Sequence, residues 1–163
     1  MSLEALLIPE SIVKRLREEA RRIGLGFDEY IIDLLSRNLD PDDRSIRYAE
    51  ASRELLDQAR KELNKKNIRQ ASEKLWGSVA LAVKAYALWK DKETLTSYSD
   101  LWRYSGKIID ELGDWVSDAW THGNAMHTCF YEGWCSERHV EEALKRIERF
   151  VNKVVSLVKN SRS

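Results

Sequence analysis

Apolar residues recur every three to four positions along most of the chain, and this period predicts amphipathic α-helices. Turn and capping residues divide the pattern into segments. The predicted helices span about residues 10–23, 28–39, 41–64, 67–90, 98–120 and 136–159. In the fourth of these helices the apolar positions cover more than half of the circumference, so we expect it to lie at the centre of the fold.

Four of the helices are long and are joined by short connections, which indicates an all-α protein with an antiparallel four-helix bundle over residues 41–163. Residues 1–40 predict a separate, short strand-helix-helix module, in which the apolar run LLIP (6–9) is the strand. An isolated strand needs a partner, so we expect this module to serve dimerisation or packing and the protein to be a homodimer.

Charge and composition limit the cellular location and the binding partners that we expect for the protein. The 163 residues include 27 Lys and Arg and 27 Asp and Glu, so no overall field draws the chain to nucleic acid or to an anionic membrane. No apolar run approaches the roughly 18 residues of a membrane span, and the N-terminus lacks the features of a signal peptide. The two cysteines, Cys129 and Cys135, are too few for a disulfide framework. We therefore expect a cytoplasmic protein with free thiols and no contact with membranes.

The segment HGNAMHTCFYEGW (122–134) differs from the rest of the chain because no helical period survives in it. It concentrates side chains that can stack on a base, donate from an amide, exchange a proton or accept through a carboxylate. The candidate ligand-binding residues are Asn124, His127, Tyr131, Glu132 and Trp134. Two interpretations remain open: the segment binds a nucleotide or an RNA end, or its aromatic side chains cover the open end of the bundle.

Lys84 is a further candidate ligand-binding residue. It lies on the mostly apolar fourth helix, where an inward-facing ammonium group needs a carboxylate or a bound anion. Residues 41–90 carry eleven basic and seven acidic side chains, an excess that favours contact with RNA or phosphate in this part of the chain.

Metal and cofactor chemistry have little support in the sequence. Five His and Cys side chains lie between residues 122 and 139, but they include no Cys-x-x-Cys pair. On a helix, His122 and His127 would lie about 140° apart. The chain also has no Gly-rich phosphate loop and no nucleophile elbow. We expect no metal and no cofactor.

The segment YAEASRELLDQARKELNKKNIRQASEKLWGSVALAVKAYAL (48–88) resembles the first helix pair of HEPN domains, in which the second helix is rich in small residues around a Lys. Together with NAMHTCFYEGW (124–134), it makes the chain over residues 41–158 similar to the archaeal PaREP family of repeated open reading frames. The resemblance implies a HEPN-like helical bundle.

The chain departs from HEPN ribonucleases in one motif. Many of those enzymes carry an Arg followed, after four to six residues, by a His, and none of the three His residues here has an Arg at that spacing before it. We therefore expect a non-catalytic binding or regulatory module for RNA or a nucleotide, although the question of catalysis stays open. One alternative is a divergent HEPN ribonuclease, or a partner subunit of a nucleotidyltransferase, that uses His127 and Glu132. A second is a scaffold that binds only protein, such as a partner encoded by a neighbouring gene.

The N-terminal segment LLIPESIVKRLREEARRIGLGFDEYIIDLLSRNL (6–39) resembles a ribbon-helix-helix unit, in which two paired strands read the major groove of DNA. Its strand offers no Lys, Arg, Gln or Asn that could reach a base edge. Residues 1–40 also carry six basic and eight acidic side chains, the wrong balance for a DNA-binding surface. We therefore expect no specific DNA binding.

Overall fold

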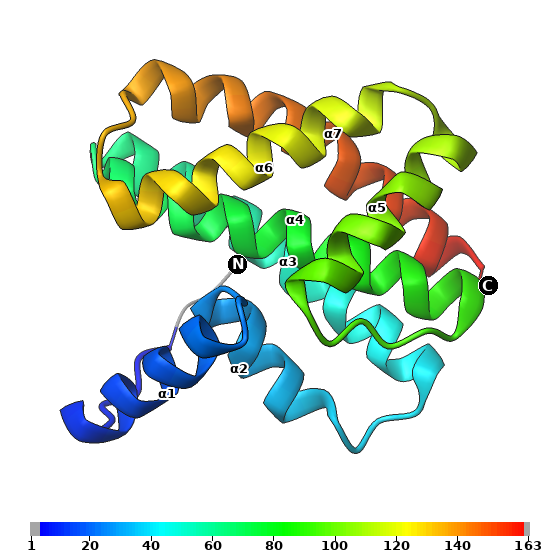
Figure 1. Ribbon diagram of the computed structural model, residues 1–163, viewed down its shortest axis with the longest axis horizontal. Helices are drawn as coiled ribbons and strands as arrows, with labels where there is room; N and C mark the ends of the chain where they lie inside the picture. The colour runs from blue at the N-terminus through cyan, green and yellow to red at the C-terminus, as the bar shows by residue number, and fades with distance from the viewer. Residues whose placement is uncertain (1–3, 162–163) are drawn as a thin grey trace.

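Helices make up most of the computed structural model, which describes residues 4–161 (Figure 1). The described part contains seven helices and no strand: α1 (Glu10–Arg22), α2 (Phe27–Ser36), α3 (Pro41–Asn64), α4 (Ile68–Asp91), α5 (Tyr98–Leu112), α6 (Trp115–Glu132) and α7 (Glu137–Asn160). The predicted all-α class is therefore confirmed. The outer ends of the two predicted domains, residues 1–3 and 162–163, lie outside the described residues.

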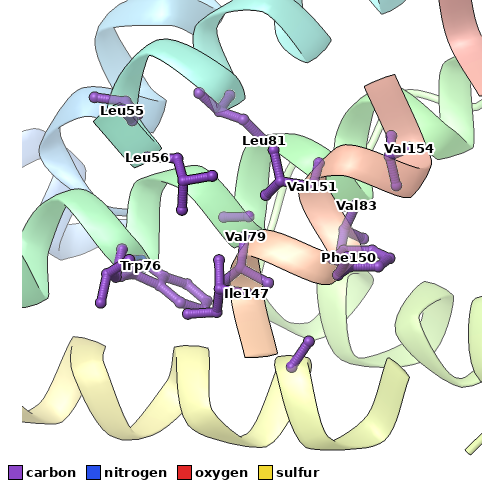
Figure 2. Close-up of a cluster of buried hydrophobic side chains, with 14 of the residues drawn as sticks. Leu55, Leu56, Trp76, Val79, Leu81, Val83, Ile147, Phe150, Val151 and Val154 are labelled. Atoms are coloured by element: carbon purple, nitrogen blue, oxygen red, sulfur yellow. The ribbon is translucent and has the colours of Figure 1, made fainter. Parts of the chain in front are cut away.

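The central position of α4 also agrees with the sequence pattern. This helix packs against α2, α3, α5, α6 and α7, and between Ala71 and Leu88 every side chain except that of Lys74 is buried. Side chains from α3, α4 and α7 point toward one another in a core that includes Leu56, Val79 and Phe150 (Figure 2). Because α6 and α7 also pack on each other, α3, α4, α6 and α7 form the bundle.

Two of the long helices begin where the sequence supplies capping groups. Asp40 precedes α3, and its carboxylate accepts a hydrogen bond from the backbone N–H of Asp43 at 2.9 Å. Ser136 precedes α7 and accepts one from the backbone N–H of His139 at 3.4 Å. No helix in residues 4–161 is both long enough and apolar enough to cross a membrane.

The predicted helix over residues 98–120 is wrong, because the chain breaks there into α5 and α6. Gly113 has a φ of +115°, a backbone conformation that side-chain-bearing residues rarely adopt, and it ends α5. The next helix, α6, then continues to Glu132, so most of the segment 122–134 is helical rather than irregular. It is α6, and not α5, that fills the fourth position of the bundle beside α4 and α7.

The N-terminal module contains the two predicted helices but not the predicted strand. Residues 4–9 run without regular secondary structure and pair with no strand in the described part of the chain. Leu6 and Leu7 are 82% and 97% exposed. The following helix, α1, projects away from the bundle (Figure 1). Among the described helices its backbone comes close only to that of α2, while its side chains Arg17 and Arg21 reach α4 and α6. A strand needs a partner edge, and residues 4–161 of a single copy supply none.

Candidate functional site

A cavity of about 510 Å³ lies between α1, α4 and α6. On each helix the lining residues recur at intervals of one helical turn and so lie on one side of the helix. Its walls include Lys14, Arg17 and Arg21 from α1, Arg69, Glu73 and Trp76 from α4, and His127, Phe130 and Tyr131 from α6. Small-molecule sites commonly have volumes of roughly 300–1,000 Å³, so the cavity is large enough for a compact organic ligand.

Aromatic rings form the inner wall of this cavity. The imidazole of His127 lies over the indole of Trp76, with ring centroids 4.7 Å apart and planes 33° apart. The ring of Tyr131 meets His127 edge-on, with its centroid 5.3 Å away. Trp76 itself is buried, whereas Tyr131 is partly exposed at the rim. This arrangement offers apolar faces on which a planar ring can stack.

Two of the arginines in the cavity wall already form hydrogen bonds or ion pairs with other residues of the chain. Arg17 Nη1 lies 3.3 Å from Glu73 Oε1. Arg69 donates to the backbone carbonyls of Phe130 and Tyr131 at 2.5 and 2.7 Å, which satisfies two free carbonyls in the last turn of α6. Arg69 therefore holds the end of α6 in place beside the cavity.

Two other basic side chains remain available. Lys14 and Arg21 form no hydrogen bond or ion pair with residues 4–161. The guanidinium carbon of Arg21 lies 5.4 Å from the centre of the Tyr131 ring, so this cation sits at the aromatic rim. Both side chains are exposed, and both can reach an anionic group of a ligand at the mouth.

A model of the archaeal PaREP1/PaREP8 family matches residues 47–151. The chain belongs to this family. No curated protein and no solved structure matches it. The PaREP1/PaREP8 match includes the α4 and α6 walls of the cavity, whereas α1 precedes the matched residues.

The structure of this PaREP1/PaREP8 protein brings two of the predicted site residues, His127 and Tyr131, to the cavity between α1, α4 and α6. Glu132 lines a smaller adjoining hollow of about 320 Å³ that shares Arg21, His127 and Tyr131 with it. Asn124 lies outside both hollows: its amide donates to the backbone carbonyl of Trp120 at 2.8 Å, and its oxygen accepts from the hydroxyl of Tyr98. These bonds occupy both ends of the Asn124 amide.

Trp134 is 70% exposed in the connection between α6 and α7 and lines neither hollow. No hydrogen bond joins His127 to Glu132 in the described part of the chain. Within residues 4–161, no three His, Cys, Asp or Glu side chains lie close enough together to hold a metal ion.

Lys84 lies away from the cavity, at the contact between α2 and α4. Its ammonium group is 2.9 Å from Glu29 Oε2 and 2.5 Å from Asp33 Oδ2, and Lys84 and Glu29 are 1% and 0% exposed. Asp33 also accepts a hydrogen bond from the hydroxyl of Tyr48 at 2.7 Å. Of the two partners that the sequence allowed for an inward-facing Lys84, a carboxylate or a bound anion, the structure supplies carboxylates.

Burial and the neighbouring charges shift the pKa values of Glu29 and Lys84 in opposite directions. Burial raises the pKa of Glu29 above its ordinary value, against the effect of the nearby ammonium group. Burial alone would lower the pKa of Lys84, but the two carboxylates outweigh it and raise that pKa. The ion pair therefore holds Lys84 in its charged form and fastens α2 to α4.

The two cysteines form a disulfide, so the prediction of free thiols is wrong. Cys129 lies in the last turn of α6 and Cys135 in the connection to α7, with Cα atoms 5.5 Å apart. The turn at Gly133, which has a φ of +72°, brings them together. The bond closes the connection that directly follows Phe130 and Tyr131, so it restrains the same end of α6 that Arg69 holds.

Burial lowers the pKa of His127 to about 4, so the imidazole in the cavity wall is neutral at pH 7. In the unfolded chain the same side chain gains a proton near pH 6.5. As the pH falls from 7 toward 4.5, the unfolded state therefore binds a proton that the folded state does not, and stability falls.

Replacing His127 by phenylalanine should remove this loss. We compare the free energy of unfolding of His127→Phe with that of the unmodified protein. When the pH is lowered from 7 to 4.5, we expect this difference to shift in favour of the variant by on the order of 1–2 kcal/mol, a value reduced for the partial exposure of the ring. Urea denaturation of both proteins at the two pH values measures the difference. An equal difference at both values would contradict a depressed pKa at His127.

Proposed function

We propose that this PaREP1/PaREP8 protein is a non-catalytic binding module whose ligand is a nucleoside phosphate, either a free nucleotide or the end of an RNA strand. The observation that carries the proposal is the meeting of aromatic and uncommitted basic side chains at one cavity, between His127, Tyr131, Lys14 and Arg21. A base needs a flat apolar face, and a phosphate needs cations or N–H donors. The cavity offers both within one small volume.

The alternative of catalysis has less support from this arrangement. A general base is normally oriented by a second group, yet His127 and Glu132 share no hydrogen bond in the described residues. The neutral imidazole of His127 lies over Trp76, where it serves as part of a stacking surface. A divergent HEPN ribonuclease would instead release products from RNA, and His127→Ala would stop that release.

We also propose that the chain forms a homodimer in the cytoplasm and that its bundle is HEPN-like. Support for the dimer comes from residues 4–9, whose apolar side chains include the exposed Leu6 and Leu7. The disulfide between Cys129 and Cys135 is compatible with a cytoplasmic location, because intracellular proteins of hyperthermophilic archaea are often rich in disulfides.

Substitution of Arg21 tests the nucleotide proposal against a neighbouring control. Arg21 lines the cavity, whereas Arg22 is also exposed on α1 but pairs with Glu19 at 2.8 Å and does not line it. We expect Arg21→Ala to weaken binding of nucleoside monophosphates by roughly tenfold, because a charge-assisted hydrogen bond to phosphate is lost. Arg22→Ala should leave affinity unchanged within about twofold. Isothermal titration calorimetry measures both.

The outcomes separate the three functions. If no nucleotide and no short RNA binds the unmodified protein, the nucleotide proposal fails and the protein-only scaffold gains support. If RNA is turned over and His127→Ala abolishes the turnover, the protein is an enzyme. Native mass spectrometry of the purified protein reports any bound nucleotide and the oligomeric state in one spectrum.

A further inference from the structure

Glu73 differs from the other acidic residues that line the cavity. Glu10 and Glu18 are exposed on α1, whereas Glu73 is 5% exposed on the central helix α4. It precedes Trp76 by three residues, so the two side chains share a face of the helix. A carboxylate therefore lies beside Trp76, the ring that His127 covers at the inner wall of the cavity.

The hydrogen-bonding capacity of Glu73 is only partly used. Oε1 accepts a single, long hydrogen bond of 3.3 Å from Arg17, and Oε2 accepts none from residues 4–161. An ionised carboxylate accepts up to about four hydrogen bonds. A ligand that fills the cavity would shut these oxygens off from water, and an acceptor that loses water without gaining a donor is costly. A ligand that brings N–H groups to Glu73 would therefore bind more tightly than one that does not. Both oxygens have lone pairs to offer, including the one that Arg17 contacts.

We infer that the base held in this cavity is guanine, with the carboxylate of Glu73 accepting from its ring N–H and its exocyclic amino group. This inference rests on the proposed nucleotide function. Guanine presents two adjacent donors on its Watson–Crick edge, which match the two oxygens of a carboxylate. Its rings stack against His127, and the phosphate reaches Lys14 and Arg21 at the mouth.

The other bases fit the carboxylate less well. Adenine and cytosine each place a ring-nitrogen acceptor beside their amino group, so one carboxylate oxygen would face a lone pair. Uracil flanks its ring N–H with two carbonyl oxygens, which repel the carboxylate on both sides. A misplaced acceptor leaves a buried polar group unpaired, and that penalty produces the selectivity.

Calorimetric titration of the unmodified protein with three nucleotides tests the base. We expect guanosine monophosphate to bind roughly tenfold or more tightly than inosine monophosphate, which lacks the exocyclic amino group, and than adenosine monophosphate. This comparison needs no variant. Equal affinities for the three would overturn the guanine inference while leaving the nucleotide proposal standing. If none of the three nucleotides binds and short RNA does not bind either, both the guanine inference and the nucleotide proposal are overturned.

Glu73→Gln then tests the residue. We expect this variant to lose roughly tenfold in affinity for guanosine monophosphate and to bind it no better than inosine monophosphate. The control is Glu18→Gln, which removes an exposed carboxylate at the same cavity and should change affinity by less than about twofold. A Glu73→Gln protein that folds and keeps the preference for guanosine would overturn the role of Glu73.

Discussion

Replacing Lys84 by methionine should lower the free energy of unfolding by about 3–5 kcal/mol, because it leaves two carboxylates at the α2–α4 contact without a cation. Glu29 is fully buried, and its only ion pair in the described residues is with Lys84. Methionine fills a similar volume but cannot compensate the charge of Glu29 or Asp33. Urea denaturation followed by circular dichroism measures the loss.

Two further variants show whether charge burial is the cause. Lys74 pairs with Asp28 on the same pair of helices at 3.0 Å, but these side chains are 20% and 19% exposed. Lys74→Met should therefore cost about 1 kcal/mol or less. Adding Glu29→Gln and Asp33→Asn to Lys84→Met should recover part of the lost stability, because no buried charge then remains unpaired. A Lys84→Met protein as stable as Lys74→Met would contradict this account.

Gly123→Ala should lower the free energy of unfolding by about 2 kcal/mol. A Cβ atom at this position in α6 would lie 2.4 Å from Cγ1 of Val79 and 3.3 Å from its Cβ. Val79 is fully buried on α4, and a branched side chain in a helix has little freedom to rotate away. The two helices must separate, and the cost of this overpacking exceeds the gain in helix propensity. Thermal and urea denaturation measure the change.

Gly106 provides the matched control for Gly123. It lies within α5, and a Cβ there would meet no atom within 4 Å. Gly106→Ala should therefore stabilise the protein by about 0.5–1 kcal/mol through helix propensity alone. In a Val79→Ala background, Gly123→Ala should lose most of its cost. If the cost is the same in both backgrounds, the close approach of α4 and α6 is not its source.

Three of the four bundle helices, α3, α4 and α7, could be predicted from sequence because local and long-range signals agree. In α3 and α7, capping residues coincide with the start of an apolar period, so pattern and cap indicate the same boundary. The break at Gly113 was missed because apolar residues continue across it at helical spacing. The continuation of α6 through residues 122–132 was missed for the opposite reason. His127, Asn124 and their neighbours interrupt the apolar period, but they do not end the helix.

The candidate site was predicted in part. His127 and Tyr131 stand out in sequence because an irregular composition surrounds them. Glu73, Arg17 and Arg21 do not, because each is an ordinary charged residue on an amphipathic helix. Only the position of α1 across the cavity from α4 brings them together. No signal in a single sequence distinguishes Arg21 from Arg22. Lys84 stands out in sequence because it is a charged residue on a mostly apolar helix. Its partners cannot be named without knowing where α2 packs.

The composite wall of the cavity bears on how ligand choice could diversify among related chains. The ring-stacking surface and Glu73 come from α4 and α6, inside the stretch that matches the PaREP1/PaREP8 family, whereas Lys14 and Arg21 come from α1, which precedes it. If the proposed nucleotide function holds, the base and the phosphate would contact different parts of the chain. Substitutions at Lys14 and Arg21 would then change the contacts to the anionic group and leave those to the base in place.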